Sequence, residues 1–177
     1  MPKSPKQKLK LLYLQKILLE QTDEDHPLTI QQLIEALAHY GIQAERKSLY
    51  DDLEALRQFG LDILRQKSKT YGYYVGSRPF ELPELKLLVD AVECSRFITE
   101  KKSRRLIGKI AGLASAYQAK SLQRQVHVSG RVKTMNESVY YNIDEIHAAI
   151  SADRQISFYY FEWTVKNEKQ YRKKGAP

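Results

Sequence analysis

Residues 28–75 read LTIQQLIEALAHYGIQAERKSLYDDLEALRQFGLDILRQKSKTYGYYV, and this stretch decides the fold. Its apolar residues recur at helical spacing in two segments, and Gly41 and Gly60 each follow the last turn of one segment. Glycine favours that position because it tolerates a positive φ. The segment after Gly60 is rich in aromatic and β-branched residues, which predicts a hairpin over 62–75.

Each predicted helix carries a local start signal or an apolar face. Thr29 lies three residues before Gln32, the spacing of a capping box that begins a helix. In the second helix, over 45–59, Leu49, Leu53 and Leu56 fall on one face and are expected to point to the core. The order of helix, tight turn, helix and hairpin predicts a winged helix-turn-helix over residues 1–78.

The front end of the 45–59 helix carries the residues expected to read DNA. A recognition helix reads bases in the major groove mainly from its N-terminal end. Here that end holds Arg46, Lys47, Ser48 and Tyr50. Arginine and lysine pair with the two acceptors of guanine, and serine or tyrosine bonds a phosphate. Because Asp51 and the acidic residues after it repel the backbone, only the first turn is expected to enter the groove.

The hairpin, as a wing, is expected to contact the DNA backbone without reading sequence. Arg65, Lys67 and Lys69 are its candidate phosphate ligands, and Thr29 at the start of the first helix is another DNA-binding candidate. The basic N-terminal segment is expected to add phosphate contacts from Lys3, Lys6, Lys8 and Lys10.

The flanking segments complete a mainly α (α+β) prediction. Residues 6–22 are expected to form a helix that ends before Pro27. Beyond Pro83 the pattern is helical over 84–92 and again over 106–117, with a short helix near Leu122 and another over 139–150. Residues 155–165, QISFYYFEWTV, predict a strand, which 166–168 turn back into 169–173.

Composition limits the classes of function. Formal net charge is +8, but residues 1–78 hold 12 Lys and Arg against 10 Asp and Glu, so the basic excess lies in residues 79–177. The single cysteine, Cys94, permits no disulfide within the chain. No run of eighteen apolar residues and no signal-peptide cleavage pattern occurs, so we expect a cytoplasmic protein without a membrane partner.

Catalytic signatures are missing from the sequence. His26, His39, His127 and His147 show no metal-binding spacing, and no glycine-rich phosphate loop occurs. We therefore expect no enzyme activity, no metal and no cofactor.

The stretches ERKSLYDDLEALRQFGLDI and YGYYV resemble the winged helix of WYL-domain transcriptional regulators, which are close to the DeoR-like repressors. The family pattern is Ser-Arg-Arg-Thr-Val-Tyr-Arg-Asp-Leu-x-x-Leu, then Gly-Ile and a Gly-Tyr wing. Two departures stand out, because Glu45 takes the place of the usual Ser or Thr cap and Asp51 that of an arginine. The matching residues of the helix are Lys47, Ser48, Leu49, Tyr50, Asp52, Leu53, Leu56 and Gly60.

This resemblance implies the organisation of the rest of the chain. Residues 79–152 are similar to the helical linker and dimerisation region of such regulators, and ISFYYFEW to the first strand of the Sm-like WYL barrel. We expect a regulator truncated near the start of that domain, over 153–177, with an incomplete pocket for an unknown effector. Because a lone aromatic hairpin exposes apolar faces, it is expected to pack on the 139–150 helix and to support a homodimer through 84–165.

One alternative function remains open. Winged helices also serve as protein–protein adaptors without DNA readout, and the near-neutral charge of residues 1–78 suits such a module. The two adjacent cations Arg46 and Lys47 favour DNA. The dependence of binding on salt distinguishes the two functions, because contacts with phosphates release counterions.

Overall fold

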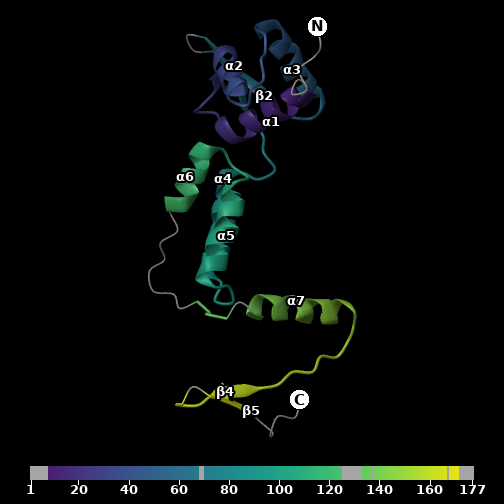
Figure 1. Ribbon diagram of the computed structural model, residues 1–177, viewed down its shortest axis with the longest axis vertical. Coiled ribbons are helices and arrows are strands. Elements are labelled where there is room, and N and C mark those ends of the chain that lie inside the picture. The colour runs from purple at the N-terminus through teal and green to yellow at the C-terminus, as the bar shows by residue number, and fades with distance from the viewer. Residues whose placement is uncertain (1–7, 68–69, 125–132, 137, 167, 172–177) are drawn as a thin grey trace.

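The computed structural model describes residues 8–67, 70–124, 133–136, 138–166 and 168–171 (Figure 1). Over these residues the protein is mainly helical α+β, with seven helices and two small antiparallel sheets. This confirms the predicted class. None of the helices within the described ranges is long and apolar enough to cross a membrane.

The first six elements form one unit around a single core. They are α1 (Lys10–Gln21), β1 (Leu28–Thr29), α2 (Ile30–His39), α3 (Arg46–Gln58), β2 (Ile63–Lys67) and β3 (Tyr71–Val75). The core combines residues from all three helices with the base of the hairpin. Its most deeply buried members are Leu14, Ile17, Leu18, Leu33, Leu37, Ile42, Leu49 and Leu53. Leu49 and Leu53 face this core as predicted.

The helix ends follow the local signals in the sequence. The Gln32 amide donates to the Thr29 hydroxyl, and the Thr29 amide donates to the Gln32 side chain at 2.8 Å, so the capping box is present. Gly41 has φ 72° and Gly60 has φ 109°. Past each glycine an amide donates back to the last turn, from Ile42 to the Leu37 carbonyl at 3.1 Å after α2. Both helix ends are therefore Schellman motifs.

The hairpin extends into a third strand that the sequence analysis did not anticipate. The sheet has the order β1-β3-β2, and β1 pairs antiparallel with β3, Leu28 opposite Tyr73. Two residues carry no strand periodicity of their own, which is why β1 was not predicted. The pairing also explains Gly72, since a Cβ there would lie 2.7 Å from the Pro27 Cβ.

Three further helices build a second, smaller core. They are α4 (Leu82–Cys94), α5 (Glu100–Ala111) and α6 (Ala116–Arg124), and they bury Leu85, Ala111, Ala114 and Leu122 together. The prediction of one continuous helical stretch over 106–117 was wrong. The chain leaves the helix after Ala111 and starts a new one after Ser115, whose hydroxyl accepts from the Gln118 amide at 3.1 Å.

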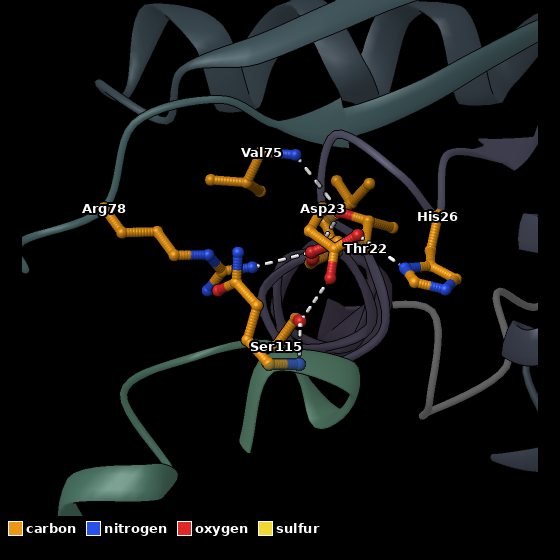
Figure 2. Close-up of polar contacts among 8 residues, drawn as sticks. Thr22, Asp23, His26, Val75, Arg78 and Ser115 are labelled. Atoms are coloured by element: carbon orange, nitrogen blue, oxygen red, sulfur yellow. Dashed lines mark hydrogen bonds and ion pairs between the residues drawn. The ribbon is translucent and has the colours of Figure 1, made fainter. Parts of the chain in front are cut away.

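A polar junction joins the two cores where α1 ends (Figure 2). The Asp23 carboxylate accepts from the Ser115 hydroxyl and lies 2.6 Å from the His26 ring nitrogen. Arg78 donates to the Thr22 carbonyl at 2.7 Å, and the Thr22 hydroxyl accepts from the Val75 amide at 3.1 Å. Because Thr22 and Asp23 are buried, these bonds satisfy groups that would otherwise lose water without compensation.

The last elements lie apart from both cores (Figure 1). They are α7 (Ser138–Ser151), β4 (Phe161–Trp163) and β5 (Lys169–Tyr171). The helix at 139–150 and the turn back to 169 are confirmed, but the strand is shorter than the predicted 155–165. The prediction that the aromatic segment packs on the helix at 139–150 was wrong. No residue of α7 is buried, and Phe158, Tyr159 and Tyr160 are exposed.

Candidate nucleic-acid interface

The first turn of α3 presents two cations to solvent. Its N-cap, Glu45, has extended φ and ψ and makes no side-chain capping bond, as expected from the departure at this position. Arg46 and Lys47 follow and are both exposed. The Arg46 Nε donates to the Tyr50 hydroxyl at 3.3 Å, and this hydrogen bond raises the pKa of Arg46.

Ser48 has a different role from its neighbours. Its hydroxyl accepts from the Lys10 Nζ at 2.6 Å, and the same ammonium lies 2.5 Å from the Asp52 carboxylate. Lys10 is only 6% exposed. The prediction that Lys10 contacts phosphate was therefore wrong, because it is buried between α1 and α3. Ser48 is half-buried, and its hydroxyl already has a partner within the protein.

The acidic residues of α3 divide between the inner and outer faces. The charge of Asp52 is compensated by Lys10, so it repels an approaching phosphate less than expected. Asp51 and Glu54 are exposed on the outer side of the helix. Glu54 pairs with Arg57 at 3.3 Å, whereas Glu45 and Asp51, both exposed near the first turn, are in no ion pair among the described residues.

The hairpin carries a stacked group of cations and one aromatic ring. The Arg65 guanidinium lies 4.5 Å from the centre of the Tyr71 ring, and the Lys67 Nζ lies 6.0 Å from it. In the register of the hairpin, Lys67 is opposite Tyr71 and Arg65 is opposite Tyr73, so these side chains share one face. Stacking limits the freedom of both cations at the exposed end of the strands. Lys69 lies outside the described residues.

A groove runs between α3 and this face of the hairpin. One pocket of about 440 Å³ is lined by Tyr50, Leu53, Glu54, Arg57, Arg65 and Tyr73. A second, of about 310 Å³, is lined by Thr29, Ile30, Gln31, Arg46, Tyr50, Thr70, Tyr71 and Tyr73. Tyr50 belongs to both pockets. The structure thus brings Arg46, Tyr50, Arg65 and Thr29 together, and Lys47 lines neither pocket.

Two features of this site were missed in the sequence. The Arg57 Nε donates to the Ile63 carbonyl at 2.9 Å and so ties the end of α3 to the start of β2. The stacking of Arg65 on Tyr71 was also missed, although the predicted hairpin implied that Lys67 lies opposite Tyr71, the pairing that the structure has. The Thr29 hydroxyl, a predicted DNA ligand, is used in the cap of α2.

Within the described ranges, no group of three or more His, Cys, Asp and Glu side chains is arranged to hold a metal ion. Comparisons of the chain with protein families, with curated proteins and with solved structures find no match. The function must therefore be argued from the site itself.

Proposed function

We propose that the protein is a sequence-specific, double-stranded DNA-binding transcriptional regulator with a winged helix-turn-helix in residues 1–78. The observation that carries this proposal is the adjacency of two cationic surfaces, the first turn of α3 and the Arg65–Tyr71–Lys67 stack of the hairpin. A recognition helix needs an exposed, basic N-terminal end, and a wing needs cations at its exposed end.

The chemistry of the first turn fits base recognition. Arg46 and Lys47 are exposed donors suited to the guanine acceptors, and each such contact discriminates by roughly 1–3 kcal/mol. Tyr50 holds the Arg46 guanidinium through its hydroxyl, which reduces the entropy lost on binding. The exposed carboxylate of Asp51 keeps the later turns away from the DNA backbone, so α3 enters the groove by its first turn only.

The remaining assignments of this proposal rest on the resemblance to WYL-domain regulators. In that reading, α4–α7 form the linker and dimerisation region, and β4–β5 begin the Sm-like barrel that senses an effector. The protein is then a cytoplasmic homodimer without a catalytic centre. A twofold protein binds two half-sites about 34–36 Å apart, or a multiple of that distance.

The test measures binding to random duplex DNA at increasing salt, followed by selection of bound sequences from a random pool. About six phosphate contacts weaken binding by roughly a thousandfold between 50 and 200 mM salt. We expect Lys47→Ala to lose discrimination at one base of the selected site, and Arg65→Ala to weaken binding to all sequences alike. Equal effects of the two variants would contradict the assignment of groove and wing.

A protein–protein adaptor is the second candidate, because the net charge of residues 1–78 is only +2. In that case binding to random duplex DNA would be weak and would not change steeply with salt. The same titration decides between the two functions. A flat response, together with no sequence selected from the pool, would favour the adaptor.

A further inference from the structure

Helix α5 has two sides of opposite character. Ser103, Ile107 and Ala111 are buried and pack it into the second core. The other side carries four exposed cations at helical spacing, and we call this surface the α5 basic face. Its members are Lys101, Arg104, Arg105 and Lys109.

Most of the charge on the α5 basic face has no carboxylate partner in the part of the chain that the structure describes. Arg104 pairs with Glu100 at 3.0 Å. Among the described residues, no carboxylate lies within 4.0 Å of the charged nitrogens of Lys101, Arg105 or Lys109. Gly108 lies in the middle of the face, and a Cβ there would meet nothing within 4 Å, so an extended ligand has room to approach.

The α5 basic face also contributes to an imbalance of charge in the chain. Residues 79–177 carry 17 Lys and Arg against 11 Asp and Glu, whereas the unit that contains α3 is nearly neutral. From Lys101 to Lys109 the face spans nine residues of helix, a rise of about 12 Å. Each strand of duplex DNA carries one phosphate per ~3.4 Å of the helix axis, so a stripe of this length faces about three or four phosphates of one strand.

We propose that the α5 basic face binds the phosphate backbone of duplex DNA, outside the segment that α3 reads. This inference rests on the proposed function. Helix α1 lies between α3 and α5 along the long axis of the molecule (Figure 1), so the second contact lengthens the footprint and does not share the groove of α3. Because its contacts are with phosphates, it adds affinity without sequence discrimination.

The test uses the full chain and a random-sequence duplex of about 45 base pairs, roughly 150 Å long. Arg105→Gln is combined with Lys109→Gln. The matched control combines Arg154→Gln with Lys166→Gln, which removes the same charge from exposed positions in the same half of the chain. We expect the α5 pair to reduce the slope of log affinity against log salt by about 1.8, or 0.9 per lost contact, and the control pair to leave it unchanged.

A second measurement locates the contact directly. Cys94, which is exposed, is replaced by Ser, and Gly108→Cys then carries an iron chelate that cleaves nearby DNA. Cleavage at a fixed distance outside the segment protected by α3 supports the proposal. No cleavage above that of Cys94→Ser alone, or an equal loss of salt dependence in both charge pairs, overturns it.

The two proposals fail in different ways. If Arg46→Ala and Lys47→Ala change no sequence preference while the α5 pair still lowers the salt slope, the function of α3 is wrong and the α5 contact stands. If α3 discriminates sequences and the α5 pair has no effect, only this inference is wrong. Loss of binding to phosphatidylserine vesicles by the α5 pair, with DNA binding unchanged, would assign the face to an anionic membrane and overturn the proposal.

Discussion

The role of Lys10 shows how burial decides the function of a single residue. In the sequence it is one of four lysines before residue 11, and nothing local separates it from Lys8. In the structure its ammonium is buried against Ser48 and Asp52, which lie 38 and 42 positions along the chain. A contact at that sequence separation has no local signal, so the sequence predicted a phosphate ligand where the fold has an internal ion pair.

We expect Lys10→Met to destabilise the protein by about 2–4 kcal/mol, because it leaves the Asp52 carboxylate poorly solvated and without its partner. Urea unfolding followed by circular dichroism measures this change. Lys16→Met is the control, since Lys16 is half-exposed and its pair with Glu20 spans 4.0 Å; its effect should be below about 0.5 kcal/mol. Equal losses of unfolding free energy in the two variants would show that the buried pair contributes no more to stability than the exposed pair.

Because the pKa of Asp23 is lowered in the folded protein, we expect the stability of the protein to depend on pH. Burial raises the pKa of Asp23, but the hydrogen bonds from Ser115 and His26 and the charge of His26 lower it by more, so the pKa lies below the ordinary value of 3.8. Between the folded and unfolded pKa values the unfolded state binds more protons, and stability therefore rises with pH. The stabilisation is complete above the unfolded pKa and is lost as pH falls through the folded one.

We therefore expect the free energy of unfolding of the wild type to fall more steeply below about pH 4 than that of Asp23→Asn. Thermal unfolding at a series of pH values measures the difference. Glu24→Gln, at the adjacent exposed position, should retain the steep dependence of the wild type. If Asp23→Asn and the wild type run parallel down to pH 2, the junction does not depend on the charge of Asp23.

At the scale of elements, the sequence correctly predicted the helix ends that depend on contacts between residues close in the chain. The caps of α2 and the glycines after α2 and α3 act within a few residues, and the structure has them where expected. The predictions failed where contacts between residues far apart in the chain, or a break in the apolar pattern, determine where an element begins or ends. Strand β1 exists only by pairing with β3, and the α5–α6 break interrupts an apolar period that runs on through Leu113. The Ser115–Gln118 capping signal was present in the sequence and was overlooked.

Gly60 gives a test of one such helix end. Its φ of 109° is unfavourable for any residue with a Cβ, so Gly60→Ala should destabilise the protein by roughly 1–2 kcal/mol. Gly108→Ala is the matched control, because Gly108 lies inside α5 and its Cβ would meet nothing within 4 Å. That change should stabilise the protein by about 0.5–1 kcal/mol. Opposite signs in chemical unfolding are the expected result, and the same sign would contradict the account of the cap.

At the scale of the whole molecule, several large apolar side chains outside the two cores are exposed to solvent. Leu87, Phe97, Ile150 and Phe158 are each more than 60% exposed, and all lie within the predicted dimerisation range of 84–165. Burial of such side chains against a second chain would remove their apolar surface from water, which is favourable. The proposal of a homodimer gives this surface a partner, although the arrangement that buries it was not predictable from the sequence.

We expect light scattering, at protein concentrations well above micromolar, to give twice the mass of one chain. Ile146→Glu with Ile150→Glu should shift the population to monomer, because both side chains are exposed on α7 in the single chain. Leu12→Glu, on the exposed side of α1, should leave the mass unchanged. A wild type that scatters as a single chain would exclude the homodimer.

Helix α1 has a mechanical consequence for the molecule. Its first residue, Lys10, contacts Ser48 and Asp52 of α3. Just beyond its last residue, Thr22 accepts a hydrogen bond from Arg78 and Asp23 accepts one from Ser115. Twelve helical residues make a stiff rod of about 18 Å between these two attachments. The two attachments therefore link the start of α6, through α1, to the first turns of α3. Because both attachments are buried or half-buried polar contacts, the position of α3 relative to the second core depends on both ends of α1.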